Sequence, residues 1–259
     1  MNKYMKYTSK EKEIELHKFL SREYIDKRYA TGYSMLYNDY WNEEIISFLP
    51  NKNDDRILDC GCGTEILLKD LDKLYKSSYG LDISYEMLRN AKNWIRESDL
   101  IVGDIETLPF SEGSLDVIVC RGSLHHVPLP QKALDEIYKS LKKGGSLILS
   151  EPCIDSIIIR FIRKILYKKS DKFGENHKAF RSIDLEEMLI NSGFMIEKTK
   201  PFGYFAYPLC GFPDFIPLLN YVPFSKHITK FLISFDKFLS HIPIMENSWH
   251  WHIIILAKK

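Results

Sequence analysis

The chain lacks the features that mark membrane-spanning, secreted and nucleic-acid-binding proteins. No stretch approaches the roughly 18 uninterrupted apolar residues that a membrane-spanning helix needs. The N-terminus alternates charged and polar side chains and contains no apolar core of signal-peptide length. The formal net charge is only +1, so the basic excess that neutralises phosphates is missing. We therefore expect a cytoplasmic protein that does not bind nucleic acid.

Cysteine is also scarce, with five residues in a chain of 259. The number is odd and the spacing suggests no disulfide framework. Cys60 and Cys62 form a C-x-C pair, but no second Cys or His pair lies nearby to complete a tetrahedral metal site. We expect reduced thiols and no metal. Hydrophobic residues make up 45% of the chain, which is enough for the core of one domain, with or without a cap.

What the chain does contain, from residue 56 onward, is an alternation of short apolar runs and helical stretches. Strands separated by helices imply βαβ units and a parallel sheet. The glycine pair Gly144-Gly145 would end the last of these helices, since a helix C-terminus favours a residue with positive φ. The apolar runs are residues 56–60, 78–82, 100–103, 115–120 and 146–150, and the helical stretches are 65–75, 85–97 and 130–143.

The segments on either side of this alternation have other patterns. Two helices are predicted before it, at residues 10–27 and 33–48. After it we expect a helix at 184–192, with Asp184 as its N-cap, and strands at 195–199 and 250–257. The predicted organisation is a helical cover at 1–54, an α/β core at 55–200, an aromatic-rich cap at 201–246 and a final core strand at 247–259.

The stretch Arg-Ile-Leu-Asp-Cys-Gly-Cys-Gly-Thr-Glu, residues 56–65, carries the first chemical signal. Gly61 and Gly63 let the backbone turn sharply after a strand and approach a ligand without interference from Cβ. The amides at the start of the following helix would then point at that ligand. Such a turn suits a nucleotide-like cofactor at the carboxyl ends of the strands, although a purely structural strand–helix turn has the same glycines.

Two aspartates follow the next two predicted strands. Asp82 lies 19 residues after Gly63, near the spacing at which an acidic residue meets ribose hydroxyls. Asp104 follows the third strand, where its side chain would accept from an adenine amino group. Each aspartate has a structural alternative, as a helix cap and as an ordinary Gly-Asp turn. Three strand ends with suitable residues favour a cofactor site.

In these motifs the chain resembles the class I S-adenosylmethionine (SAM)-dependent methyltransferases, in particular the ubiquinone/menaquinone methyltransferase group. The resemblance covers roughly residues 55–152. It implies a doubly wound, mostly parallel seven-stranded sheet of Rossmann-like methyltransferase type, with N-terminal helices and a helical cap before the last strand. The matching segments are LDCGCGT (58–64), GLDIS (80–84), GDIETLPF (103–110), LDVIVCRGSLHHV (115–127) and LKKGGSLILSEP (141–152).

The resemblance also implies residue roles in a SAM site. Asp59, Gly61 and Gly63 would line the methionine end of the cofactor. Asp82 with Ile83 would hold its ribose, and Asp104 with Ile105 its adenine. The chain departs from the family at Glu65, where relatives usually have a third glycine; we expect this carboxylate to point outward. A nicotinamide dehydrogenase is disfavoured, because its motif requires glycine where this chain has Ile66.

Candidate catalytic residues follow the fourth predicted strand. Histidine as a residue type suits a general base near neutral pH, so we take His125 and His126 as the catalytic candidates; a structural role for both is the alternative. Glu151 and His177 are weaker candidates. Arg121 would pair with the SAM carboxylate or with an acidic substrate, or else remain solvated.

The acceptor is predicted from the aromatic segment near the C-terminus. If its aromatics line a pocket, the acceptor is a small molecule that is aromatic or lipophilic; the alternative is that they only bury the cap. Tyr29 and Tyr33 would line the SAM site if the N-terminal helices cover it. The aromatic residues of this segment are Phe202, Tyr204, Phe205, Tyr207, Phe212, Phe215, Tyr221, Phe224, Phe231, Phe235 and Phe238.

Two basic amphipathic stretches, residues 157–169 and 227–241, allow two interpretations. They are either surface helices of a globular domain or helices that make peripheral contact with a membrane. Two alternative functions also remain open: O-methylation of a sugar or polysaccharide precursor, and a non-catalytic SAM-binding module. The sequence indicates neither the acceptor atom nor the oligomeric state.

Overall fold

The computed structural model describes residue 10 and residues 31–50, 55–64, 66–91, 98–168, 179–211, 217–242 and 249–259. The predicted helix at 10–27 therefore lies almost wholly outside the described residues, as do Tyr29, Glu65 and His177. Among the helices in the described ranges, none is both long enough and apolar enough to span a membrane.

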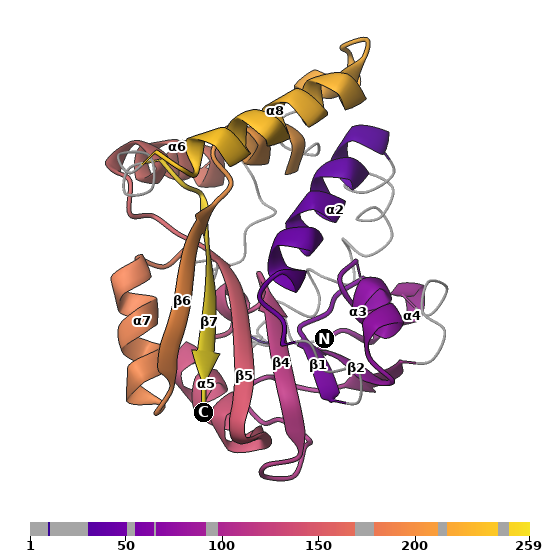
Figure 1. Ribbon diagram of the computed structural model, residues 1–259, viewed down its shortest axis with the longest axis vertical. Helices are drawn as coiled ribbons and strands as arrows, with labels where there is room; N and C mark the ends of the chain where they lie inside the picture. Colours follow the sequence, from indigo (N-terminus) through magenta and orange to yellow (C-terminus); the bar gives the residue numbers. More distant parts are fainter. Residues whose placement is uncertain are drawn as a thin grey trace, which may run out of the picture.

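A seven-stranded sheet forms the centre of the molecule, in the order β3-β2-β1-β4-β5-β7-β6 (Figure 1). Strands β1 to β5 are parallel, whereas β7 is antiparallel to both of its neighbours. This arrangement confirms the predicted doubly wound, mostly parallel sheet. The strands are β1 (Arg56–Cys60), β2 (Ser77–Asp82), β3 (Asp99–Val102), β4 (Leu115–Arg121), β5 (Leu141–Pro152), β6 (Met195–Phe202) and β7 (His252–Lys258).

Helices pack on both faces of the sheet because successive strand residues point to opposite sides. On β1, Ile57 joins a buried cluster with residues of α2 and α3, while its neighbour Leu58 joins a second cluster with residues of α5 and α7. The helices are α2 (Gly32–Ile46), α3 (Leu68–Leu74), α4 (Tyr85–Ala91), α5 (Pro130–Ser140), α6 (Ile157–Lys168), α7 (Ser182–Asn191) and α8 (Ser225–Leu239), with short turns η2 (Leu124–His126), η3 (Tyr207–Gly211) and η4 (Pro217–Asn220).

Two predicted details are wrong. The helix expected at 130–143 ends at Ser140, and Gly144-Gly145 lie inside β5. Leu141 pairs with Leu115 of β4 and Ser146 pairs with Val117, so the residues between them bulge out of the ladder. A Cβ at Gly145 would come 3.0 Å from the Asp116 carbonyl oxygen, which explains the glycine there.

The second correction concerns the start of α7. The helix begins at Ser182, so Asp184 is not its N-cap; Arg181 occupies that position and makes no side-chain capping bond. Asp184 lies in the first turn, where its carboxylate suits the positive helix end. It also accepts hydrogen bonds from the Arg181 guanidinium.

The segment between β6 and α8 is held by one buried carboxylate. Asp236 of α8 is 2% exposed and accepts hydrogen bonds from the backbone amides of Tyr204, Phe205 and Ala206 at 2.8–3.1 Å. Burial raises the pKa of Asp236, and these three amides oppose the shift by stabilising the charge. The contact fixes α8 across the end of the sheet where β7 begins (Figure 1).

Candidate functional site

The polar residues predicted for the cofactor meet at one edge of the sheet. Since β1, β2, β4 and β5 are parallel, their carboxyl ends lie together. This edge faces the end of the molecule that carries α6 and α8 (Figure 1). Asp82 ends β2 and Arg121 ends β4. Glu151 is the penultimate residue of β5, before Pro152.

The glycine turn after β1 requires both of its glycines. Gly61 has φ +78° and Gly63 has φ +55°, a region that favours glycine. A Cβ at Gly61 would lie 2.3 Å from the Cβ of Ser123, so no side chain fits there. Ser123 in turn donates a hydrogen bond to the Cys60 carbonyl oxygen at 2.7 Å. At Gly63 a Cβ would meet no atom within 4 Å, which leaves space beside the turn for a ligand.

Asp82 fixes the shape of this turn. Its two carboxylate oxygens accept hydrogen bonds from the amide of Gly63, at 2.9 Å, and from the amide of Ser84, at 2.8 Å. Each oxygen keeps a second lone pair, so the carboxylate still has the capacity to accept from a diol. Ile83, between Asp82 and Ser84, is half-buried. The structure therefore brings Asp82 and Gly63 together as the sequence predicts.

Asp59 is a buried carboxylate behind the glycine turn, and it is 1% exposed. Neither of its oxygens makes a hydrogen bond of ordinary geometry with any residue that the structure describes. Burial raises the pKa of Asp59 to about 7; the charge of Arg121 opposes the shift and that of Asp82 adds to it. A carboxylate in this state is stabilised by a cationic ligand, such as the ammonium group at the methionine end of SAM.

Asp104 and Ile105 lie beyond β3, on the other side of the turn. Ile105 is buried, and its Cδ1 would lie 3.4 Å from a Cβ on Gly61. The Asp104 carboxylate accepts from the Glu106 amide at 2.9 Å and pairs with the ammonium of Lys10 at 2.5 Å. Lys10 also pairs with the buried Glu106, so an N-terminal residue reaches the position predicted for adenine.

Arg121 connects β4 to α2. Its guanidinium donates to Oδ1 of Asn38 at 2.6 Å and lies 4.3 Å from the ring centre of Trp41. Trp41 itself donates to the hydroxyl of Ser150 on β5 at 2.9 Å. These contacts place α2 beside the carboxyl ends of the central strands. Neither Asn38 nor Trp41 has a sequence signal beyond its helical spacing.

His125 and Glu151 form a buried pair at the end of β4 and β5. Nδ1 of His125 lies 2.8 Å from Oε2 of Glu151, and the amides of Ser123 and Leu124 donate to Oε1 of the same carboxylate. Burial raises the pKa of Glu151 to about 7, against these amide bonds and the charge of His126. When Nδ1 of His125 donates a hydrogen bond to the carboxylate, Nε2 is the ring nitrogen that remains free to act as a base. The half-buried His126 lies against it, with ring centres 4.1 Å apart.

The aromatic residues predicted for the cap divide into two groups. Phe202, Tyr204 and Tyr207 are buried, and Phe202 and Tyr207 pack on α2. Phe212 and Phe215 lie outside the described residues. The others are at least 37% exposed: Phe205, Tyr221, Phe224, Phe231, Phe235 and Phe238. Tyr33 is buried, and its hydroxyl donates to Oδ1 of Asn220 at 2.8 Å.

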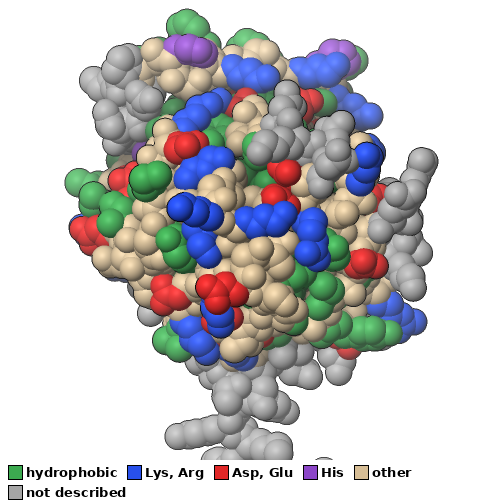
Figure 2. All heavy atoms as spheres, turned by 60° about the horizontal axis from the view of Figure 1, so that its bottom comes forward, with side chains coloured by type: hydrophobic (Ala, Val, Ile, Leu, Met, Phe, Trp, Pro, Cys, Tyr) green, Lys and Arg blue, Asp and Glu red, His purple; other side chains and the backbone are tan. Residues whose placement is uncertain are grey.

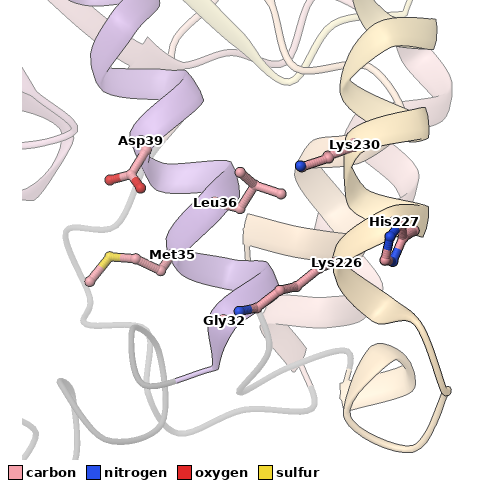
Figure 3. Close-up of a pocket in the computed structure, with 7 residues that line it drawn as sticks. All are labelled: Gly32, Met35, Leu36, Asp39, Lys226, His227 and Lys230. Atoms are coloured by element: carbon pink, nitrogen blue, oxygen red, sulfur yellow. The ribbon is translucent and has the colours of Figure 1, made fainter.

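A pocket of about 400 Å³ lies between α2 and α8, and none of the predicted cap aromatics lines it (Figure 3). Asp39 belongs to its wall and lies 3.5 Å from the ammonium of Lys69 on α3. The prediction that the cap aromatics line a pocket is therefore not supported by this cavity. Its lining residues are Gly32, Met35, Leu36 and Asp39 of α2 and Lys226, His227 and Lys230 of α8.

His252, at the start of β7, has no sequence signal as a site residue. It is 2% exposed, and neither ring nitrogen makes a hydrogen bond with a residue in the described ranges. Its ring packs edge-on against Trp41 and Tyr207, with centres 4.6 and 4.4 Å apart. Burial lowers the pKa of His252 well below its ordinary value, and the charge of Arg163 adds to the effect, so the ring is neutral.

Among the described residues, Cys153, Asp155 and His250 lie close enough together to hold a metal ion, with ligand atoms within 4.8 Å of one another. His250 Nε2 is already 3.2 Å from the Asp155 carboxylate, which also accepts from Ser182. Although burial opposes it, these bonds lower the pKa of Asp155 to about 2. Burial raises the pKa of Cys153, so the thiol is protonated.

The comparisons with known proteins agree with this geometry. Residues 58–149 match the model of a methyltransferase domain family. An uncharacterized protein of Methanocaldococcus jannaschii is 35% identical over 182 residues, which cover 67% of this chain and 69% of that protein. The chain belongs to the class I SAM-dependent methyltransferases. Family membership implies SAM as the cofactor, and Asp59, Gly63 and Asp82 fit it.

Other relatives of this methyltransferase extend the comparison. The demethylmenaquinone methyltransferase of Lactococcus lactis is 26% identical over 227 residues, which cover 78% of this chain and 89% of that enzyme. An uncharacterized 37.1 kDa protein in a transposon of Streptomyces fradiae is 29% identical, and the match covers 69% of this chain but only 53% of that protein. A solved structure from Thermotoga maritima, described as a possible histamine N-methyltransferase, has TM-score 0.64 and 20% identity over 95% of this chain and 99% of that one.

The buried Asp59 predicts a pH-dependent affinity for SAM. A group with a pKa of about 7 is half ionised at pH 7 and roughly 10% ionised at pH 6, so SAM should bind about fivefold more weakly at pH 6. The ammonium of SAM stays protonated over this window. Calorimetry at the two pH values measures the ratio. Asp59→Asn should remove the dependence, whereas the exposed Asp99→Asn should keep it; equal affinities in the unsubstituted protein would contradict the role of Asp59.

Proposed function

We propose that this methyltransferase transfers a methyl group to a hydroxyl or an acidic carbon of a small lipophilic, aromatic acceptor. The observation that carries the proposal is the His125–Glu151 pair at the carboxyl edge of the sheet. Its Nδ1-to-carboxylate contact of 2.8 Å leaves the imidazole oriented as a base, next to the turn that fits the cofactor. A base is needed only when the acceptor must lose a proton.

When bound, SAM supplies a methyl group that is already activated by its sulfonium charge. The chain's contribution is then alignment and proton removal. Alignment of reacting groups is worth effective molarities of roughly 10⁵–10⁸ M. The glycine turn and Asp82 position the cofactor, and α2 closes one side of the edge through the contacts of Asn38 and Trp41.

The nature of the acceptor rests on two supports. One relative is a demethylmenaquinone methyltransferase, whose name specifies a lipophilic quinone. The other is the apolar environment beside the edge, where Trp41, Tyr207 and the neutral ring of His252 pack together. Sites for lipophilic ligands are built mostly from such apolar and aromatic side chains.

Labelled methyl transfer tests the proposal. The purified chain is incubated with methyl-labelled SAM and three acceptor classes: a prenylated naphthoquinol, a catechol and a nucleotide sugar. We expect label in the quinol or the catechol. Label in the nucleotide sugar would favour O-methylation of a sugar precursor instead. SAM binding with no transfer to any acceptor would favour the non-catalytic module.

A further inference from the structure

The end of the molecule beyond the carboxyl edge carries an unusual concentration of exposed apolar side chains. Among the described residues, eleven of the nineteen exposed large hydrophobics lie in α6 or between residues 218 and 238. Scattered apolar residues on a surface are ordinary, but a concentrated group marks an interaction site. The eleven are Ile157, Ile158, Phe161, Ile165, Leu218, Tyr221, Val222, Phe224, Phe231, Phe235 and Phe238, and we call them the apolar end.

Both helices turn this surface away from the sheet. On α6, Ile159 is fully buried while Phe161 is 65% exposed. On α8, Ile233 packs into the core while Phe231 and Phe238 are 69% and 64% exposed. Both helices lie at the same end of the molecule, beyond the carboxyl edge of the sheet (Figure 1).

In the described residues of α6 and of 217–242, the exposed charged side chains have one sign. Residues 157–168 contain no carboxylate, and residues 217–242 contain only Asp236, which is 2% exposed and bound to three backbone amides. The chain's net charge is +1, so the excess is local. Figure 2, which brings the opposite end forward, shows Lys and Arg interspersed with Asp and Glu there. The exposed basic residues of these segments are Arg160 and Lys164 of α6 and Lys226, Lys230 and Lys237 of α8. On α8, Lys226 and Lys230 also line the pocket beside α2, and the Lys237 ammonium lies 4.8 Å from the ring centre of Tyr40, so these lysines border the apolar end on its α2 side.

Phe224 adds a conformational observation. It is the one residue other than glycine with positive φ among those described, at +61°, and it is 76% exposed. A bulky side chain in this region costs free energy, and such outliers persist where function retains them. An aromatic ring held outward at the start of α8 suits insertion into the interfacial layer of a bilayer.

We propose that the apolar end docks on the surface of an anionic lipid bilayer. Exposed aromatic and aliphatic side chains enter the interfacial layer, and the surrounding lysines and arginine pair with anionic headgroups. A second copy of the chain is disfavoured as the occupant, because two such faces would oppose basic residues with basic residues. Docking does not depend on the proposed function, but it would bring the carboxyl edge toward a lipid-borne acceptor.

Vesicle sedimentation of the full chain tests docking. One set of vesicles consists of phosphatidylcholine alone, and in the other set about 30% of the phosphatidylcholine is replaced by phosphatidylglycerol. We expect binding to the anionic vesicles, at least tenfold weaker binding to the neutral ones, and loss at high salt. Equal binding to both, or none to either, would overturn the proposal.

Variants localise the contact. Arg160→Gln with Lys164→Gln, two exposed residues of α6, should weaken binding about 25-fold, at about fivefold for each basic residue near an anionic surface. Phe231→Ser with Phe238→Ser should weaken binding at least tenfold. Because both rings are exposed, the variant should still fold, which circular dichroism checks.

The matched control, Ile190→Ser with Lys143→Glu, alters an exposed apolar residue of α7 and an exposed lysine of β5 and should bind as the unsubstituted chain. Full affinity in the face variants, or face variants that only abolish a dimer, would refute the lipid surface as the occupant.

Discussion

Replacing Asp82 by Ala is expected to weaken SAM binding by roughly ten- to 150-fold, which corresponds to about 1.5–3 kcal/mol. Two effects act in the same direction. The substitution removes the acceptor that we assign to the ribose hydroxyls. It also releases the amides of Gly63 and Ser84, which Asp82 holds at 2.9 and 2.8 Å, so the glycine turn loses its support.

Calorimetry with SAM and with its demethylated product measures this effect, and NAD should not bind either protein. The control is Asp99→Ala, which removes an exposed aspartate at the opposite end of the neighbouring strand β3. Thermal unfolding of both variants separates loss of the turn from loss of the whole fold. Unchanged SAM affinity in a folded Asp82→Ala protein would exclude Asp82 from the cofactor site.

The sequence predicts the glycine turn well because that turn depends on backbone geometry. Gly61 and Gly63 are needed for positive φ, and the carboxyl ends of parallel strands must meet at one edge. Residue types at the strand ends therefore single out Gly63 and Asp82 without knowledge of distant contacts, while the roles of these residues and of Asp59 in holding SAM stay predictions. The same logic predicts that the first five strands are parallel.

The contacts that the sequence does not predict are tertiary. Arg121 meets Asn38, 83 residues earlier, and His252 packs on Trp41 from the other end of the chain. Lys10 reaches Asp104 across 94 residues. No local pattern distinguishes these side chains from ordinary helix or strand residues, so only the packed structure identifies them.

The wrong boundaries have the same cause. Gly144-Gly145 have the composition of a helix end, but pairing of β5 with β4 begins three residues before them and places them in a bulge. The aromatic segment had two interpretations because composition does not tell which side chains face the core. The hydrogen bonds of Asp236 fix the orientation of α8, so that Ile233 faces the core and Phe231 faces outward.

The largest expected effect concerns proton removal. We predict that His125→Asn lowers kcat by roughly 10²–10⁴-fold on an acceptor that must lose a proton, the range that a general base contributes. SAM affinity should remain within a few fold, because His125 contacts Glu151 rather than the glycine turn. His241→Gln is the control, since that histidine is exposed after the end of α8.

Glu151 is expected to act through His125, as a positioning residue. Because burial raises the pKa of Glu151 to about 7, the carboxylate that accepts from Nδ1 of His125 is lost as the pH falls below 7, so Glu151→Gln should lower kcat and remove this part of the acid limb of the pH–rate profile. A merely structural role would lower stability without removing this limb. Urea unfolding of the variant distinguishes the two effects, because the substitution also disturbs the amides of Ser123 and Leu124.

His126 provides the remaining test. Its ring lies 4.1 Å from that of His125 and is more exposed, so the substitution His126→Asn should perturb kcat far less if His125 is the base. The reverse result would exchange the two roles, leaving the edge of the sheet as the reaction site. If single and double variants retain kcat on the identified acceptor, alignment alone suffices and both histidines are structural. Methyltransferase family membership would stand even then, because it rests on the fold and the glycine turn.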